Sequence, residues 1–320
     1  MLRHLEAPPI QRKSTQLPGQ YGIIWLSIYW TESRCRCMNW KEALETVEPR
    51  FRSAVAAIDE GNVGELERLL AKHPSLLQER AAGYGEGYFR EPYLLWFIAE
   101  NPIRNEKLPG NIAEVAQALI RAAERERVDS LSEQLDYALG LVCSGRVPRE
   151  CGLQLKLIDV LVSAKADPAG AVLPALAHRE LAAVERLLER GAPLTLPVAV
   201  CTGRLAAAKQ LGATAGAAER QLALTAAALY GKARALALVL GLGGVELNAY
   251  SPAGFHAHAT ALHHAVDSGS LDAVRVLVEA AADLSIKDRL FQGTPVGWAN
   301  YLERTDIAAY FQEWGGRCNE

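Results

Sequence analysis

One stretch near the C-terminus limits the possible folds of this chain more than any other. It runs from Thr260 to Asp288 and reads TALHHAVDSGSLDAVRVLVEAAADLSIKD. Thr260 and Ser270 are suited to cap helices, because a hydroxyl oxygen accepts a free backbone N–H at a helix N-terminus. Gly269 is suited to end a helix, since a positive φ is cheap only for glycine. An apolar stripe at helical spacing follows, formed by Leu271, Val274, Leu277 and Val278. The stretch therefore predicts two short helices joined by a tight turn, with an extended segment after them.

This pattern resembles the ankyrin repeat. The ankyrin consensus is Thr-Pro-Leu-His-x-Ala, a turn glycine, an apolar helix and then Gly-Ala-Asp before a hydrophobic residue. Ala261 stands where the consensus has proline, and Ala281 where it has glycine. The pattern restarts at Thr294, 34 residues after Thr260 and close to the ankyrin period of about 33. Weaker copies precede the defining stretch from about residue 50 onwards.

The resemblance implies an all-α fold, an ankyrin-repeat solenoid of about seven to eight helix-turn-helix units, several of them irregular. Between residues 250 and 316 the chain is also similar to bacterial ankyrin repeat domain-containing proteins of undescribed function, and the Phe-His-Ala-His run at 255–258 carries that likeness. Such arrays leave an extended concave surface free. The resemblance therefore implies a scaffold or adaptor that binds another protein through its concave face and finger loops.

The beginning of the chain does not follow the repeat pattern. We predict that residues 1–37 form an irregular or disordered extension, that residues 38–320 form the ankyrin-repeat array, and that Met38 is the natural start. Residues 1–37 have a basic start and an apolar run, Tyr21–Trp30, as a signal peptide would. No small-residue cleavage site follows this run. A secreted effector is the alternative that an export signal would support.

Composition narrows the classes of function. A hydrophobic fraction of 50% is enough for a continuous core, and a net charge of −3 argues against a general nucleic-acid or membrane-surface binder. The six cysteines lack the spacing of a disulfide scaffold or a zinc finger, which fits reduced thiols in the cytoplasm. No apolar run approaches the roughly 18 residues that cross a bilayer. We therefore expect a cytoplasmic monomer whose partner is another protein, with no nucleic acid and no membrane.

Histidines concentrate in one short run, where His256, His258 and His263 lie close in sequence to Asp267. Two histidines and a carboxylate can hold a transition metal, and His263 and Asp267 share a helix face because they are one turn apart. A metal-dependent or small-molecule enzyme that uses His256, His258 and His263 is therefore one alternative. The resemblance implies another role for His263, which occupies the consensus histidine position and would bond to local backbone. No catalytic motif accompanies the run, so we expect no enzyme, no metal and no cofactor.

An eleven-residue insert, 249–259, separates the defining stretch from the unit before it. In an ankyrin array, the finger is the extended loop that connects one helix pair to the next, and it needs only a few residues. This finger is longer and adds large aromatic and polar side chains. We predict a partner-binding patch on an exposed loop, formed by Tyr250, Phe255, His256 and His258 and extended by Phe291 in the next finger. The alternative is that Phe255 folds back and covers a gap left by the irregular unit before the insert.

Overall fold

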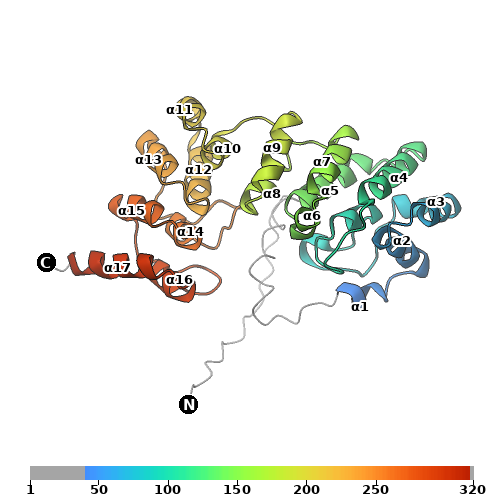
Figure 1. Cartoon of the computed structure of the whole chain (residues 1–320), viewed down its shortest axis with the longest axis horizontal. Coiled ribbons are helices and arrows are strands. Elements are labelled where there is room, and N and C mark those ends of the chain that lie inside the picture. Colours follow the sequence, from blue (N-terminus) through green and yellow to red (C-terminus); the bar gives the residue numbers. More distant parts are fainter. Residues whose placement is uncertain (1–39, 318–320) are drawn as a thin grey trace, which may run out of the picture.

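The computed structural model describes residues 40–317, and every regular element in that range is a helix (Figure 1). The α-helices are α1 (Trp40–Leu44), α2 (Pro49–Asp59), α3 (Val63–Lys72), α4 (Ile112–Arg125), α5 (Leu131–Cys143), α6 (Arg146–Glu150), α7 (Gln154–Ser163), α8 (Val172–Ala177), α9 (Leu181–Glu189), α10 (Leu196–Cys201), α11 (Leu205–Thr214), α12 (Ala217–Leu229), α13 (Ala233–Leu242), α14 (Ala261–Ser268), α15 (Leu271–Glu279), α16 (Pro295–Tyr301) and α17 (Thr305–Arg317). Three short 3-10 helices complete the set: η1 (Pro74–Leu77), η2 (Gly87–Phe89) and η3 (Leu94–Ala99). The predicted extension, residues 1–37, lies outside the described residues.

The helices form successive antiparallel pairs along a curved array, which Figure 1 shows in chain order from blue to red. The pairs are α2 with α3, η3 with α4, α5 with α7, α8 with α9, α10 with α11, α12 with α13, α14 with α15, and α16 with α17. First helices pack on first helices and second helices on second helices. The predicted all-α ankyrin-repeat solenoid is confirmed. No helix in the range 40–317 combines the length and the apolar character needed to span a membrane.

The defining stretch folds as its local chemistry dictates. Thr260 and His263 form a capping box at the start of α14, and Gly269 ends this helix in the left-handed region at φ 73°. The Ser270 hydroxyl then accepts the Ala273 N–H at 3.2 Å and caps α15. Ala265 on α14 is fully buried. Because its side chain is small, the first helices of neighbouring units can approach closely.

The first half of the array departs from the regular repeat because long loops replace tight turns. Loop 81–92 buries Tyr84 and Phe89 completely, and their rings pack edge-on 6.3 Å apart. Loop 100–111 is organised by Glu100, whose buried carboxylate accepts the backbone N–H of Arg104 at 2.7 Å and that of Asn105. Buried side chains here supply the constraints that a turn glycine supplies elsewhere.

The stacking is interrupted between the α8–α9 pair and the α10–α11 pair. α8 packs on α5 and α9 on α7, whereas α10 packs on α12 and α11 on α13. Across the interruption, α8 has at most marginal contact with α10, and α9 likewise with α11, within the described part of the chain. We call this interruption the junction. It divides the array into an N-terminal block that ends with α9 and a C-terminal block that begins with α10.

Candidate functional site

The insert 249–259 closes on itself and folds back onto the array. Tyr250 and Thr260 form an isolated antiparallel bridge, and the Ser251 N–H donates to the Ala259 carbonyl at 2.9 Å. The side chain of Phe255 is 0% exposed and that of His256 is 5% exposed. The prediction that Phe255 and His256 sit exposed on a loop is therefore wrong.

The junction explains why these two side chains are buried. The insert reaches back across it, and His256 donates from Nε2 to the carbonyl of Ala177, at the end of α8, at 3.0 Å. Phe255 is buried, as the alternative drawn from the sequence expected. The neighbouring His256 makes this contact with α8 at the junction, whereas the alternative placed the gap at the unit directly before the insert.

The histidines of this run are bonded within the protein. The Thr260 N–H donates to Nδ1 of His263 at 3.3 Å, and Nε2 of His263 donates to the Gly293 carbonyl at 3.1 Å. His264 bonds from Nε2 to the Ser251 hydroxyl at 3.0 Å. Burial lowers the pKa of each histidine here, to about 4 for His258, where neighbouring His256 adds to the effect. At neutral pH these rings are uncharged.

The hypothetical metal site at His256, His258, His263 and Asp267 is not assembled. Both ring nitrogens of His263 are occupied by hydrogen bonds, as predicted from its consensus position. Asp267 pairs instead with Arg179, which lies in the loop after α8. Across residues 40–317, no group of three or more His, Cys, Asp or Glu side chains has an arrangement that could hold a metal ion.

The finger before α16 is held by one buried carboxylate. Asp288 is 0% exposed and accepts the N–H groups of Phe291 at 2.6 Å and Leu290 at 2.8 Å through Oδ1. Through Oδ2 it accepts the N–H of Gly293 at 2.8 Å and the indole N–H of Trp298 at 3.0 Å. Burial alone would raise the pKa of Asp288, but these hydrogen bonds outweigh it and the pKa is lowered. The finger is thus a rigid turn rather than a loose loop.

The same finger is fastened to the insert. Arg289 lies over the ring of Tyr250, with 3.9 Å from the guanidinium carbon to the ring centre, and its backbone N–H donates to the His258 carbonyl at 2.7 Å. The Tyr250 hydroxyl donates to the Lys287 carbonyl at 2.7 Å. Phe291 stays 49% exposed. Tyr250 and Phe291, predicted from the sequence, are therefore brought to one surface, whereas His258 is partly buried with its ring stacked on Trp298.

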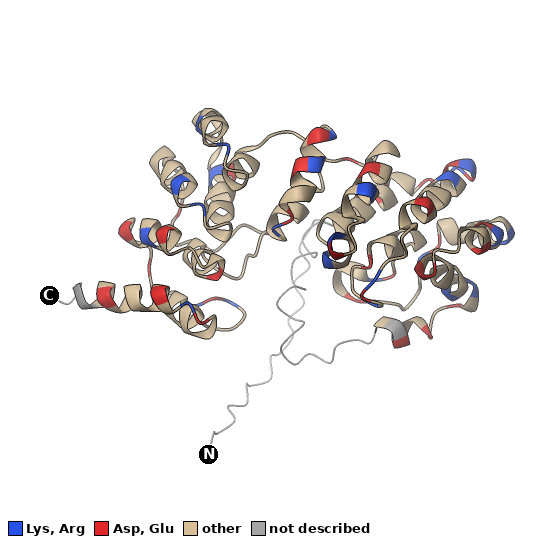
Figure 2. Ribbon diagram, in the orientation of Figure 1, with Lys and Arg blue, Asp and Glu red and all other residues tan. Residues whose placement is uncertain are grey.

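We call this surface the finger surface and define it as Tyr250, Lys287, Arg289, Leu290 and Phe291. Sequence reasoning missed Lys287, Arg289 and Leu290, of which the first two are exposed and the third is 37% exposed. The signal that could have found them is two cations flanking one aspartate in a finger, directly before Leu-Phe. Figure 2 shows both signs of charge on the loop that precedes α16.

A comparison with protein families decides the class of the chain. Residues 196–288 match the family model described as ankyrin repeats in 3 copies, from the start of α10 through the α14–α15 pair and into the finger. This segment consists of ankyrin repeats. The match covers less than a third of the chain, all of it in the C-terminal block. A comparison with curated proteins finds no match. Ankyrin repeats generally mediate protein–protein interactions, and the family is typically a non-enzymatic scaffold.

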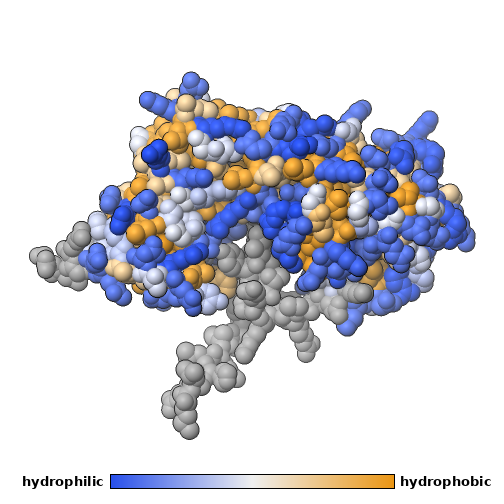
Figure 3. Space-filling view, viewed as in Figure 1, coloured by the Kyte–Doolittle hydropathy of each residue, from blue (hydrophilic) through white to orange (hydrophobic). Residues whose placement is uncertain are grey.

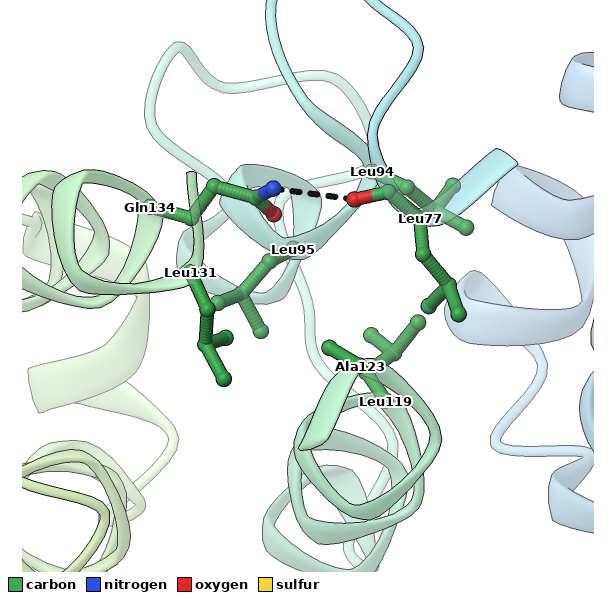
Figure 4. Close-up of a pocket in the computed structure, with 7 residues that line it drawn as sticks. All are labelled: Leu77, Leu94, Leu95, Leu119, Ala123, Leu131 and Gln134. Carbon is green, nitrogen blue, oxygen red and sulfur yellow. Dashed lines mark hydrogen bonds between the residues drawn. The ribbon is translucent and has the colours of Figure 1, made fainter. Parts of the chain in front are cut away.

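The structure also contains a small cavity between η1, η3, α4 and α5 (Figure 4). Its volume is about 10 Å³, which is room for about one water molecule. The lining is Leu77, Leu94, Leu95, Leu119, Ala123, Leu131 and Gln134. The amide of Gln134 donates to the Leu77 carbonyl at 2.9 Å, so the polar group that faces the cavity is satisfied. The cavity is a packing gap, too small for a substrate.

An open hollow of about 340 Å³ lies beside α2 and loop 100–111. The charged side chains that line this hollow form ion pairs within the protein. The guanidinium of Arg104 donates to both carboxylate oxygens of Asp59, each at 2.9 Å, and pairs with Glu100 at 2.8 Å. The hollow has the size of a small ligand site, but this cluster serves to hold the loop and presents no base to a substrate, because the Glu100 side chain is 0% exposed.

Proposed function

We propose that this ankyrin-repeat protein is a non-enzymatic adaptor that binds another protein through its finger surface. One observation carries the proposal: exposed aromatic, aliphatic and cationic side chains stand together on a turn that the buried Asp288 holds rigid. A preorganised surface binds at lower entropic cost, because little has to be ordered on association. Aromatic side chains add large contact area with few rotatable bonds.

The charges of the finger surface indicate the chemistry of the partner. Lys287 and Arg289 are exposed, and neither forms an ion pair with another residue in the range 40–317. Asp288 lies between them in the sequence, but its carboxylate is buried and accepts four hydrogen bonds from within the protein. We infer that the partner presents carboxylates beside an apolar side chain. On the face viewed in Figure 3, apolar residues form separate patches among polar ones, so hydrophobicity alone does not select a site.

The proposal requires neither a cofactor nor a second copy of the chain. The side chains that sequence analysis offered for chemistry are bonded internally, as described above for His263 and Asp267. We place the function in the cytoplasm, since the cysteines lack a disulfide pattern.

Affinity capture with the purified full-length protein, followed by quantitative mass spectrometry, tests this function. Phe291→Ala and Arg289→Glu are the test variants. Tyr301→Ala is the matched control, because Tyr301 is 86% exposed and lies on α16 outside the finger. We expect a protein that the wild type and the control retain and that both test variants lose. Its binding constant should weaken at least about tenfold for Phe291→Ala, as for the loss of an interface anchor.

Two measurements make this result decisive. The melting temperature of Phe291→Ala should match the wild type, because the ring is half exposed in the folded protein. The affinity for wild type should also fall as salt rises, since exposed charges are screened. A partner retained equally by all variants would place its binding site elsewhere on the array and refute the proposal.

A further inference from the structure

Helix α8 contacts α12 across the junction between the two blocks, and polar contacts to the end of α8 add to this packing. The Tyr230 hydroxyl donates to the Leu176 carbonyl at 2.7 Å, and His256 donates to the Ala177 carbonyl at 3.0 Å. Carbonyls in the last turn of a helix lack partners within the helix, so they are available for such bonds. Both donors belong to the C-terminal block.

An ion pair adds to these contacts. Arg179, which has a left-handed φ of 59°, pairs with Asp267 of α14, and these two residues are 88 positions apart in the chain. The side chain of Asp267 is only 15% exposed. The loop after α8 is therefore fastened to the C-terminal block by charge as well as by hydrogen bonds.

Four histidines gather where these contacts meet, and we call them the histidine cluster: His178, His256, His258 and His264. The ring centre of His256 lies 5.5 Å from that of His264 and 6.1 Å from that of His258. The ring centres of His258 and His264 lie 6.2 Å apart. His178 follows α8 directly, and His256 contributes to the lowering of its pKa. Because His256 bonds to Ala177 at the end of α8, the histidine cluster joins the N-terminal block to the insert and to α14.

Other charged groups face the cluster from the elements around it. Arg179 lowers the pKa of His256 and His264, and Asp267 raises that of His256 and His258. Asp288 in the finger raises the pKa of His258, and His263 on α14 lowers it. The two carboxylates are already engaged, one with Arg179 and the other with the four donors of the finger. A proton taken up by the cluster therefore adds positive charge next to Arg179 in a buried space.

We propose that the junction is an acid-operated hinge, held closed while the histidine cluster is neutral and opened when its members take up protons. Opening releases the insert from α8 and lets the two blocks change their relative orientation. This alters where the finger surface stands with respect to the N-terminal block. The hinge does not depend on whether the finger surface binds a protein.

The direction and size of the effect follow from proton linkage. Burial and neighbouring His256 lower the pKa of His178 to about 3, and burial lowers that of His264 well below 6.5. A histidine that regains its ordinary pKa of about 6.5 on opening binds more protons in the open state. The closed state therefore has its full stability above about pH 6.5 and loses it as the pH falls. For the closed-state pKa of about 3 at His178, protonation of this one side chain raises the opening constant roughly 25-fold between pH 7 and pH 5.

Distance measurements by double electron–electron resonance test the hinge in the full-length chain. One spin label goes on the exposed Cys151 of the N-terminal block, and the other on Asp272→Cys at the start of α15. The cysteines outside the described residues are changed to serine: Cys35, Cys37 and Cys318. Between pH 7.5 and pH 5.0 we expect a reversible shift or broadening of the distance distribution, with helical circular dichroism retained. An unchanged distribution, or one that changes only together with loss of helix, would overturn the proposal.

Variants identify the groups that respond. His178→Gln and His264→Gln remove titration while keeping a hydrogen-bonding side chain, so each should reduce the pH response of the opening constant, by roughly 25-fold for His178→Gln. His73→Gln is the control, because it removes a histidine that follows α3, away from the junction. It should leave the response intact. Loss of the response in His73→Gln, or its persistence in both histidine variants, would assign the transition to other groups and refute the hinge. Hydrogen exchange in the unlabelled wild type provides a readout that does not depend on the folding of any variant. After correction for the pH dependence of the chemical exchange rate, we expect segment 249–259 to be less protected at pH 5.0 than at pH 7.5.

Discussion

Replacing Phe255 with alanine measures how much the insert contributes to the core. The ring is 0% exposed and packs edge-on to the His256 ring at 5.6 Å. A phenylalanine side chain buries roughly 150–250 Å², which at about 25 cal/mol per Å² corresponds to about 4–6 kcal/mol as an upper bound. Measured losses for buried Phe→Ala changes are about 3–5 kcal/mol. We expect the free energy of unfolding to fall by about 3–5 kcal/mol.

Urea unfolding followed by circular dichroism measures this loss, with Phe255→Leu as the matched control. Leucine keeps an apolar side chain in the same space, so the control should lose much less stability than the alanine variant. In a repeat array each unit contacts only its neighbours, and the damage should therefore stay close to the insert. Hydrogen exchange should rise first in segment 249–268 and last in α2 and α3.

Three outcomes would contradict the reasoning about Phe255. A loss below about 1 kcal/mol in the alanine variant would mean that the ring is not a core side chain. Equal losses in the alanine and leucine variants would mean that the volume of the ring does not matter. If the alanine variant failed to capture the partner while its free energy of unfolding was unchanged, Phe255 would belong to the binding surface, as the sequence first indicated.

Two further predictions concern side chains that the array buries. Ala265→Phe should overpack the contact between first helices and cost about 1–3 kcal/mol of unfolding free energy. An unchanged melting temperature would show that Ala265 does not lie at that contact. Burial raises the thiol pKa of both Cys143 and Cys201, whereas Cys151 is exposed. Iodoacetamide at pH 8, followed by peptide mass mapping, should therefore modify Cys151 well before the buried pair, and equally fast modification of Cys143 would contradict its burial.

Much of the regular fold could be predicted because its determinants are local. Thr260, Gly269 and Ser270 act within one or two helical turns, through capping bonds and a left-handed φ that glycine adopts cheaply. His263 could be placed for the same reason, since its bonds reach Thr260 and the next finger at fixed repeat spacing. Phe291 also stays at the surface, as its position in a finger predicted.

The candidate site could be predicted only in part, because burial of the insert depends on residues far away in the chain. His256 contacts Ala177, which lies 79 positions earlier, and Asp267 pairs with Arg179, which lies 88 positions earlier. Periodicity in the sequence does not show that the stacking is interrupted after α9, so the sequence could not decide between an exposed insert and one that folds back. The sequence by itself therefore determined the repeating helix pairs and their caps. Only the tertiary structure decided that Phe255 and His256 close the junction while Arg289 and Phe291 face outward, since long-range packing sets which side chains lose contact with water.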